Sequence, residues 1–554
     1  MKPSSLNLHD ALLLHQQGNI QDAISAYLAI EIKDDNTQVK QYELLGIAHA
    51  QLNELTTALS YFEKAHKLAP SLLSIQNNLG TCYKKMGHAK KAVKLYLDIL
   101  KHNPFQCVTL NNLASLYIDL KKEDQAIILL KKAISLRPEY NDAYYNLGLI
   151  LKDAQYFKFA ADLQHGKSAY QYALNQETQK NYEVSKTYYN QCLDNALSHH
   201  GLARVLLALD QDEDALYHFI QAQKLDPSIP HLMENIASYY HIKGMHVNAV
   251  EYWLKSLSQT DDPLDIWYNV GVAYQHLNRH EDALRYLNMV LEKEPNHQKA
   301  HTNIAALALQ NNQREIAIIH YEKVISLDPK NEEIQYILSA LKQKDHQFEQ
   351  SPANYVSNLF DQYAGHYNQH LLKMLKYQLP EKVKYSLHEY LKPKSDKTIL
   401  DLGCGTGLLG STLSPFAKEL TGVDLSPNML TEAFKTGFYH HLIQQDALTY
   451  LNDANTFDLI IALELCPYIG NIEPLLQSIH AHLSIDGMFI FSIETGSKSY
   501  ALSENARYQH NVIWVNNLLD TIGFSIVEEE PTILRTQNTK PVSGHWFIIK
   551  RNPA

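Results

Sequence analysis

A repeat of 34 residues runs through the first 340 residues and limits what this part of the chain can fold into. In each unit a Leu-Gly or Leu-Ala pair, an alanine and a proline return at fixed places. Three successive units carry Leu45-Gly46, Ala58 and Pro70, then Leu79-Gly80, Ala92 and Pro104, then Leu113-Ala114, Ala126 and Pro138. The small residues let two helices approach closely, and the proline ends the second helix. Because one helix pair cannot bury its apolar face alone, we expect the units to stack into an all-α solenoid.

The array extends beyond these three units. The pattern resumes at Leu202-Ala203 and continues in steps of 34 to Ile304-Ala305. We interpret residues 1–36 as a further N-terminal unit, residues 141–200 as irregular units and residues 331–344 as a polar capping helix. The predicted solenoid with its cap therefore occupies residues 1–345.

This pattern resembles the tetratricopeptide repeat family over roughly residues 5–345. The resemblance implies a right-handed solenoid whose concave groove holds a peptide or the surface of a protein partner. The alternative is an array that only organises oligomers or positions another domain. Asparagines recur before the Leu-Gly pair, at Asn77-Asn78, Asn111-Asn112 and Asn303. They either hold an extended backbone in the groove or serve as structural amides, and both readings stay open.

Composition and charge exclude several classes of partner. The net charge is −11, so we expect no nucleic acid. The five cysteines show no CxxC spacing, which predicts neither a zinc site nor a disulfide framework and fits a reducing cytosol. We expect no signal peptide, because residues 1–9 lack a basic region followed by an apolar core, and no run is long enough to span a membrane. The expected location is cytoplasmic, and the oligomeric state stays open.

The remaining third of the chain has a different pattern. We interpret residues 346–397 as a linker and a helical lid, since residues 344–352 are polar and end in Ser351-Pro352. Short apolar runs at 398–402, 419–424, 457–463, 488–493, 524–528 and 545–550 then alternate with helical patterns. Such alternation predicts an α/β domain at residues 398–554 with a doubly wound sheet of six to seven strands.

A glycine loop follows the first of these runs. Asp401 ends the run, Gly403, Gly405 and Gly407 follow, and Asp424 ends the second run. Glycines let a backbone approach a ligand closely, and a carboxylate at the end of the second strand can accept both ribose hydroxyls. The G-x-G-x-G spacing argues against a pyrophosphate and favours S-adenosylmethionine, whose ammonium group can donate a hydrogen bond to Asp401. Asp446, after the third strand, is a candidate acceptor for the adenine amino group.

Three stretches resemble the motifs of class I S-adenosylmethionine-dependent methyltransferases, and more closely of bacterial ones preceded by tetratricopeptide repeats. They are Asp401-Leu402-Gly403-Cys404-Gly405-Thr406-Gly407, Val423-Asp424-Leu425-Ser426 and Gln445-Asp446-Ala447. The resemblance implies a Rossmann-like, seven-stranded sheet with S-adenosylmethionine as cofactor. The residues expected to bind it are Asp401, Gly403, Gly405, Gly407, Asp424, Leu425, Asp446, Ala447 and Tyr363. Tyr363 belongs to a segment, residues 354–370, that we expect to cover the cofactor together with Phe360 and Tyr367.

Candidate catalytic residues follow the fourth and fifth strands. Glu464 stands where this family usually has an aspartate, and Tyr468 follows it in Leu465-Cys466-Pro467-Tyr468. That tetrad departs from the motif of methyltransferases acting on the nitrogen of bases or glutamine, which argues against this chemistry. His510 is a candidate general base. No metal site is predicted.

The sequence therefore predicts a methyltransferase whose repeats recruit a protein or peptide acceptor. Two alternatives stay open. One is a small-molecule methyltransferase, acting on a carboxylate or lipid-like acceptor, whose repeats bind an unrelated partner. The other is a repeat scaffold with an inactive methyltransferase domain, against which the intact glycine loop and both acidic residues count.

Overall fold

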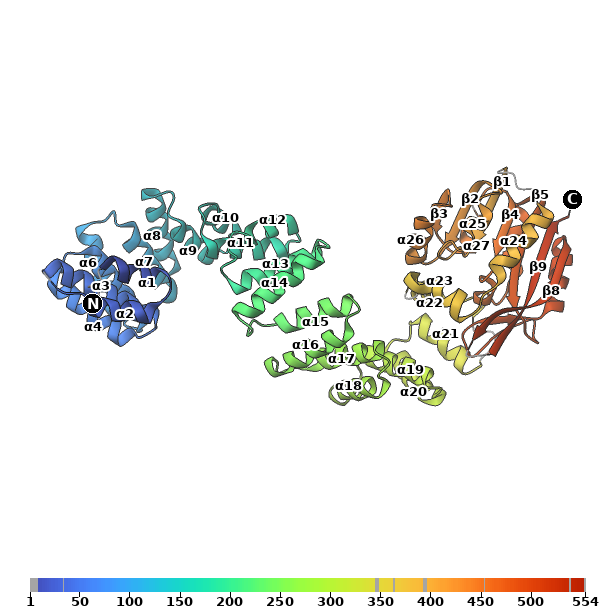
Figure 1. Cartoon of the computed structure of the whole chain (residues 1–554), viewed down its shortest axis with the longest axis horizontal. Helices are drawn as coiled ribbons and strands as arrows, with labels where there is room; N and C mark the ends of the chain where they lie inside the picture. Colours follow the sequence, from blue (N-terminus) through green and yellow to red (C-terminus); the bar gives the residue numbers. More distant parts are fainter. Residues whose placement is uncertain are drawn as a thin grey trace, which may run out of the picture. The chain divides into compact units, whose positions relative to one another are not determined.

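A computed structural model describes residues 8–32, 34–343, 348–361, 364–391, 396–452, 454–537 and 540–552. The chain forms two compact units, Met1–Ile266 and Trp267–Ala554. The first unit is entirely helical in its described residues, and the second contains the last repeats together with a seven-stranded sheet (Figure 1). No helix of the described residues is long and apolar enough to cross a membrane.

The first unit follows the predicted repeat. Its helices are α1 (Leu8–Gln16), α2 (Ile20–Leu28), α3 (Asp35–Gln51), α4 (Leu55–Leu68), α5 (Leu73–Lys85), α6 (Ala89–His102), α7 (Cys107–Asp119), α8 (Glu123–Leu136), α9 (Asn141–Leu151), α10 (Ala154–Asp162), α11 (Gly166–Thr178), α12 (Tyr182–Tyr189), α13 (Ala196–Ala208), α14 (Asp212–Leu225), α15 (Leu232–Ile242), α16 (His246–Ser256) and the 3-10 helix η1 (Leu257–Gln259). Consecutive helices pack on each other, so the irregular stretch at 141–200 also consists of helix pairs, α9 with α10 and α11 with α12.

Close packing explains the small residue in each unit. A Cβ placed on Gly46 of α3 would lie 2.6 Å from the Phe62 ring of α4, and one on Gly80 of α5 would lie 2.6 Å from the Tyr96 ring of α6. Such distances are far inside van der Waals contact, so only glycine allows the aromatic ring of the second helix to lie against the first. The predicted reason for the Leu-Gly pair is therefore confirmed.

The recurring asparagines bond to each other from repeat to repeat. Asn146 donates to Asn111 Oδ1 at 2.8 Å, and Asn112 donates to Asn77 Oδ1 at 3.4 Å. Asn77 and Asn111 are also largely buried. These contacts favour the structural reading of the amides, because a side chain committed to a neighbouring repeat has less capacity left for a bound peptide.

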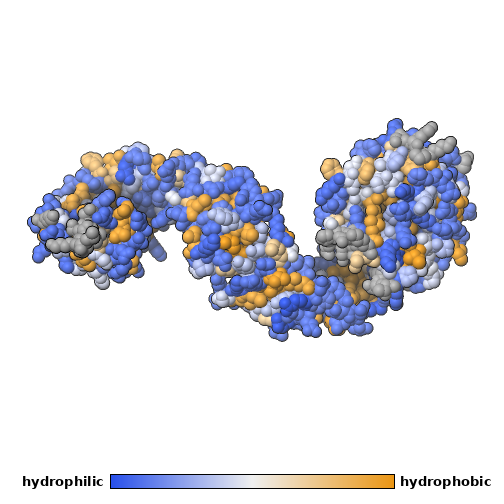
Figure 2. Space-filling view, viewed as in Figure 1, coloured by the Kyte–Doolittle hydropathy of each residue, from blue (hydrophilic) through white to orange (hydrophobic). Residues whose placement is uncertain are grey.

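Apolar side chains are also exposed along the array. Phe105, Ile128 and Ile242 are each about two-thirds exposed or more. In the face shown in Figure 2 hydrophobic residues lie between hydrophilic ones rather than in a single field. Scattered exposure of this kind is ordinary for a folded protein, so it does not by itself mark a partner site.

The second unit begins with the remaining repeats and continues into the α/β domain. The repeat helices are α17 (Leu264–His276), α18 (His280–Lys293), α19 (Gln298–Gln310), α20 (Arg314–Leu327) and the capping helix α21 (Glu332–Leu341). The α/β domain has α22 (Ala353–Asp361), η2 (Ala364–His366), α23 (Tyr367–Gln369), η3 (His370–Met374), α24 (Leu379–Tyr390), α25 (Gly410–Leu413), α26 (Pro427–Thr436), α27 (Ala447–Asn452), η4 (Cys466–Tyr468), α28 (Glu473–His482) and α29 (Val512–Ile522).

The strands are β1 (Lys397–Leu402), β2 (Ala417–Asp424), β3 (His441–Gln444), β4 (Phe457–Ala462), β5 (Leu483–Glu494), β6 (Tyr500–Leu502), β7 (Tyr508–His510), β8 (Phe524–Gln537) and β9 (Lys540–Arg551). The main sheet has the order β3-β2-β1-β4-β5-β9-β8, and β6 with β7 forms a separate hairpin. Strands β1 to β5 are parallel, whereas β9 pairs antiparallel with both β5 and β8. The predicted α/β class and seven-stranded sheet are confirmed. The β6–β7 hairpin was not predicted.

Two apolar layers cover the sheet and fix its central strands. Leu400 of β1 belongs to a core with Phe489 of β5 and helices α28 and α29. Its neighbour Ile399 belongs to a second core with Trp546 of β9 and helix α24. Because successive strand residues face opposite sides, both faces are buried, as in a doubly wound fold. The strand order reverses between β1 and β4, and ligands bind at the carboxyl ends of the strands at such a point.

Candidate functional site

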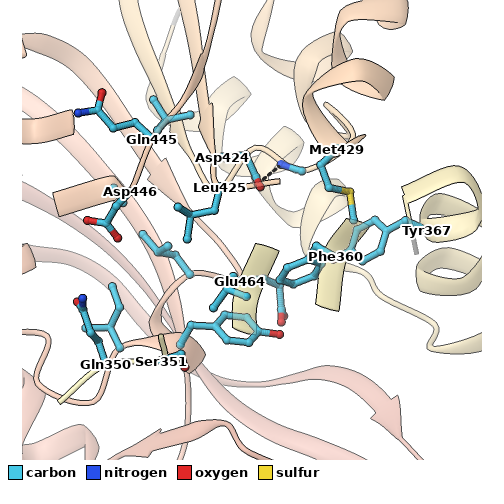
Figure 3. Close-up of a pocket in the computed structure, with 18 residues that line it drawn as sticks. Gln350, Ser351, Phe360, Tyr367, Asp424, Leu425, Met429, Gln445, Asp446 and Glu464 are labelled. Carbon is cyan, nitrogen blue, oxygen red and sulfur yellow. Dashed lines mark hydrogen bonds between the residues drawn. The ribbon is translucent and has the colours of Figure 1, made fainter. Parts of the chain in front are cut away.

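A pocket lies at the carboxyl ends of β1, β2, β3 and β4. Each strand contributes the residues at or just after its end: Gly403 and Gly405 after β1, Asp424 and Leu425 at β2, Gln445, Asp446 and Ala447 after β3, and Glu464 and Leu465 after β4. Figure 3 shows Gln445 and Asp446 on one side of this pocket and Phe360 and Tyr367 on the other. The pocket thus occupies the place where the topology favours a ligand.

The glycine loop is held in a shape that other residues resist. Gly403, Gly405 and Gly407 have φ values of 72°, 53° and 76°, in the left-handed region that favours glycine. The backbone N–H groups of Gly403 and Cys404 donate to the Val423 carbonyl, at 2.8 and 3.1 Å, which ties the loop to the end of β2. On the pocket side the nearest atoms to a Cβ built on Gly403 lie 3.8 Å away. The loop therefore leaves room for a ligand against its backbone.

Gly407 has a different environment from the other two glycines. It is not among the residues that line the pocket. A Cβ at this position would lie 3.0 Å from the Tyr439 ring and 3.1 Å from Ala433 Cα. Gly407 thus allows α26 to approach the loop, a role in packing, and its predicted contact with a cofactor remains a prediction.

Two backbone hydrogen bonds fix the carboxylate of Asp424. It accepts hydrogen bonds from the N–H of Gly405 and from the N–H of Ser426, both at 2.9 Å. Burial raises its pKa, while these backbone N–H groups act in the opposite direction. Both contacts orient the carboxylate at the end of β2, beside the glycine loop and in the pocket. This position suits an acceptor for two hydroxyl groups of a ribose.

Leu425, Asp446 and Ala447 complete this half of the pocket. Asp446 Oδ1 accepts from the N–H of Thr449 at 3.0 Å, so it caps helix α27. Capping holds the loop after β3 in place, and Leu425 and Ala447 supply apolar walls on either side of it. An apolar slot with one carboxylate at its rim is a suitable site for a flat heterocycle bearing an amino group.

Asp401 lies behind the loop instead of at the pocket surface. It is 3% exposed, is not among the pocket-lining residues and accepts a hydrogen bond from the Tyr439 hydroxyl at 2.7 Å. Burial raises the pKa of Asp401 to about 7, with the nearby Asp424 charge adding to the effect. Its predicted contact with an ammonium group stays a prediction. Tyr363 lies outside the described residues.

Two aromatic residues of the predicted lid face the pocket. Phe360 of α22 and Tyr367 of α23 both line it, and their rings lie 5.9 Å apart at a T-shaped angle. Phe360 also contacts the Tyr468 ring, with the centroids 5.5 Å apart. These contacts connect the segment before the sheet with the loop after β4.

Glu464 belongs to a buried cluster of four charges. Its Oε2 accepts from Arg507 at 2.5 Å and from Arg535 at 3.2 Å. Both arginines also donate to Glu494 Oε1, each at 2.6 Å. Two arginines and two glutamates balance, so the cluster adds no net charge to the pocket wall.

The second carboxylate oxygen of Glu464 has no such partner. Among the described residues Glu464 Oε1 is buried and makes no hydrogen bond. A buried oxygen that accepts nothing costs free energy, and Glu464 lines the pocket. A bound group with an N–H or O–H can satisfy it.

Tyr468 is held by the same arginine. Arg507 Nη1 donates to the Tyr468 hydroxyl at 2.7 Å, and the guanidinium carbon lies 4.9 Å from the ring centroid. Burial raises the pKa of Tyr468, so its phenol is neutral at physiological pH. Glu464 and Tyr468 thus both line the pocket and both bond to Arg507 of the β6–β7 hairpin, and their catalytic role stays a prediction.

His510 lies away from this group. It is fully buried, does not line the pocket and lies within 2.9 and 3.0 Å of the Ile469 and Gly470 carbonyls through Nε2. Those two acceptors place the proton on Nε2, and burial lowers the pKa of His510 to about 4. The hairpin turns its side chain into the loop after β4, where it holds two carbonyls. The geometry therefore gives no support to the expected general base.

Sequence reasoning missed some residues that line the pocket and one arginine that lies behind its wall. Gln350 and Ser351, in what we expected to be a plain linker, line the pocket, and so does Met429 of α26. Arg507 was not expected to hold Glu464, 43 positions away. Short sequence patterns do not predict these contacts, because each contact joins segments that are distant in the sequence.

Comparison with known proteins identifies both parts of the chain. Residues 374–523 match the family model described as "Methyltransferase domain". Residues 109–140, 264–297 and 298–331 match models described as "Tetratricopeptide repeat". The predicted combination of these repeats with a class I methyltransferase domain, for which S-adenosylmethionine is the implied cofactor, is confirmed.

Relatives cover the two parts separately. The malonyl-[acyl-carrier protein] O-methyltransferase of Bacillus cereus is 30% identical over 142 residues, 24% of this chain and 53% of that protein. A ubiquinone biosynthesis O-methyltransferase of Glaesserella parasuis is 29% identical over 119 residues, 19% of this chain and 49% of that protein. Anaphase-promoting complex subunit 3 of Schizosaccharomyces pombe is 22% identical over 292 residues, 51% of this chain and 40% of that protein. The chain spans about half the length of these relatives or less.

Proposed function

We propose that this chain, which carries a methyltransferase domain behind tetratricopeptide repeats, transfers a methyl group from S-adenosylmethionine to a protein or peptide that the repeats recruit. The proposal rests on one observation. A single pocket is lined both by Asp424, which the glycine loop orients, and by Glu464, whose Oε1 makes no hydrogen bond within the described residues. Asp424 suits the ribose of a nucleoside, and Glu464 Oε1 suits the N–H or O–H of a methyl acceptor.

The cofactor half is built from the strand ends. In this proposal Asp424 accepts the ribose hydroxyls, Asp446 accepts the adenine amino group, and Gly403 and Gly405 let the backbone approach the cofactor; all four line the pocket, which supports these roles. Leu425 and Ala447 flank the adenine. When bound, the cofactor supplies an electrophilic methyl group on a sulfonium, so the protein needs to position and desolvate the acceptor.

The charged side chains that line the pocket are carboxylates. Asp424, Asp446 and Glu464 line the pocket, and no lysine or arginine is among the lining residues that the structure describes. Arg507 and Arg535 are already paired with Glu464 and Glu494. An acceptor that is itself a carboxylate would therefore find no unpaired cation among these lining residues, whereas an amine or hydroxyl can donate to Glu464 Oε1.

The transfer needs no further reagent. A lone pair of the acceptor forms the new bond to the methyl carbon, the carbon–sulfur bond breaks, and its electrons stay on sulfur. The acceptor loses a proton, and Glu464 Oε1 is placed to accept the hydrogen bond through which that proton leaves. Phe360, Tyr367 and Tyr468 exclude water from this step.

The repeats support a macromolecular acceptor. An array of this length is far larger than a small-molecule site needs, and such solenoids bind extended partners along a concave surface. The relatives' names do not choose the acceptor, since both methyltransferases are named as O-methyltransferases of different molecules. The small-molecule alternative lacks a cation in the pocket for a carboxylate, and the inactive-scaffold alternative leaves the intact glycine loop unexplained.

Calorimetry with S-adenosylmethionine tests the cofactor half, and tritiated cofactor incubated with a cell lysate tests the acceptor half. We expect binding and label in a protein of defined mass. Removing residues 1–263, a deletion that ends before α17 and keeps the whole second unit, should preserve cofactor binding and abolish labelling of that protein. Label confined to small molecules in both proteins would defeat the protein-acceptor proposal, and absent cofactor binding would defeat the enzyme.

A further inference from the structure

The capping helix of the array and the methyltransferase domain share one buried cluster. Tyr336 and Ala340 of α21 pack with Leu502, Ala506 and Tyr508 of the β6–β7 hairpin. Phe348 and Tyr355, from the connection into α22, pack against the same cluster. The last helix of the repeats is thus part of the core of the second unit.

Tyr336 is the centre of these contacts. It is fully buried, its hydroxyl donates to the Ala506 carbonyl at 3.0 Å, and it accepts from Ser351 Oγ at 2.7 Å. Ala506 has a φ of 55°, unusual for a residue with a side chain, so the hairpin turn gains from a contact that fixes it. One hydroxyl of the array therefore joins the hairpin turn to the linker.

Both segments held by Tyr336 reach the pocket. Next to Ala506, Arg507 donates to Glu464, Glu494 and Tyr468. Next to Ser351, the Glu349 carbonyl accepts from the N–H of Gly470, while the N–H of Ser351 donates to the Tyr468 carbonyl, at 2.7 and 2.8 Å. The loop after β4 is therefore held by two segments, the hairpin turn and the linker, and both are bonded to Tyr336 of α21.

The cofactor half has bonds of its own, although α22, which follows the linker, also reaches it: Ser357 donates to the Leu425 carbonyl, and Asp361 accepts from the N–H of Asn428. Asp424 and the glycine loop are tied to each other and to β2 through Gly405 and Val423. Those bonds lie within the sheet and its first loop. The Tyr336 hydroxyl thus bonds to the segments that hold Glu464 and Tyr468, whereas the bonds that orient Asp424 do not involve it.

We propose that Tyr336 is a positioning residue for methyl transfer, through which the last helix of the array sets the acceptor wall formed by Glu464 and Tyr468. The proposal rests on the proposed function for its catalytic consequence, but the coupling itself is a property of the fold. A partner that moves the end of the array when it binds would then change the rate of methyl transfer.

Hydrogen exchange of the full chain tests the coupling. In Tyr336→Phe, which keeps the ring and removes the hydroxyl, exchange at residues 464–471 and 500–510 should rise about tenfold, as the loss of one or two buried hydrogen bonds permits. Exchange at 401–407, the glycine loop, should stay unchanged. The matched control is Tyr96→Phe, which removes another buried hydroxyl of the array, one bonded to Thr81. Unchanged exchange at 464–471 in Tyr336→Phe, or an equal rise in Tyr96→Phe, would overturn the proposal.

Methyl transfer gives the second readout. With tritiated S-adenosylmethionine and a cell lysate, Tyr336→Phe should incorporate about tenfold less label than the wild type, while its Kd for S-adenosylhomocysteine stays within about twofold. Equal incorporation by the two proteins would contradict the positioning role. If the wild type binds no S-adenosylhomocysteine, the proposed function fails, whereas the exchange measurement still decides the coupling.

Discussion

Arg507 Nη2 donates to Glu464 Oε2 across 2.5 Å, and this contact joins the β6–β7 hairpin to the end of β4. Both side chains are mostly buried, at 16% exposure each. The same guanidinium reaches Glu494 and the Tyr468 hydroxyl. One arginine therefore connects both residues of the acceptor wall, Glu464 and Tyr468, with Glu494 behind them, and we expect its removal to affect both stability and activity.

Replacing Arg507 by glutamine should destabilise the methyltransferase domain by about 3 kcal/mol, because two buried glutamates would share the single Arg535. The loss should appear as a lower midpoint of urea unfolding followed by tryptophan fluorescence. The double variant Arg507→Gln with Glu464→Gln restores the charge balance and should lose less than the single variant. An unchanged midpoint in Arg507→Gln would show that the cluster is better solvated than its geometry indicates.

Replacing Asp424 by alanine should weaken cofactor binding about 30-fold, since hydrogen bonds from two ribose hydroxyls to a charged carboxylate are lost. Titration calorimetry with S-adenosylhomocysteine measures the change. The exposed Asp520 of α29 offers a control, and Asp520→Ala should bind like the wild type. Equal affinities of Asp424→Ala and the wild type would remove Asp424 from the cofactor site.

Asp401 should make stability depend on pH. A carboxyl whose folded pKa of about 7 exceeds its unfolded value of 3.8 binds more protons in the folded state between those values. Its contribution to stability therefore falls as the pH rises from about 4 to about 7. Asparagine cannot ionise, so the unfolding free energy of Asp401→Asn relative to the wild type should increase over this range by on the order of 4 kcal/mol. Denaturant titrations at several pH values give this difference, and a constant difference would mean that Asp401 is not protonated in the fold.

Replacing Gly80 by alanine should destabilise the array by about 1–3 kcal/mol, although alanine usually favours a helix. The new Cβ would lie 2.6 Å from the Tyr96 ring, and overpacking outweighs the gain in helix propensity. Thermal unfolding followed by far-UV circular dichroism reports the loss. Combining Gly80→Ala with Tyr96→Leu should recover part of it, whereas a stabilised single variant would show that the ring moves aside at little cost.

The repeats and the strands at 398–402, 419–424 and 457–463 could be predicted because their signals are local. A Leu-Gly pair every 34 residues specifies which helix faces approach, and an apolar run that ends in Asp401 or Asp424 specifies where a strand stops. The positions of Asp424, Asp446 and Glu464 in the pocket follow from the same rule, since parallel strands end at one edge of the sheet.

His510 shows where local reasoning fails. It follows β5 in sequence, as a residue of the active site often does, but the β6–β7 hairpin intervenes and turns it towards the Ile469 and Gly470 carbonyls. Gln350 and Ser351 show the reverse case. A polar linker was expected, and the structure packs it against η4 as a wall of the pocket.

The sequence by itself determined the two kinds of architecture, the glycine loop and the acidic residues at the strand ends, because periodicity and short motifs depend on near neighbours. Only the tertiary structure decided that Arg507 holds Glu464 and that Tyr336 of the capping helix holds the hairpin carrying Arg507. Those contacts join residues 43 and 170 positions apart, and their geometry exists only after the sheet, the hairpin and the last repeat helix have packed together.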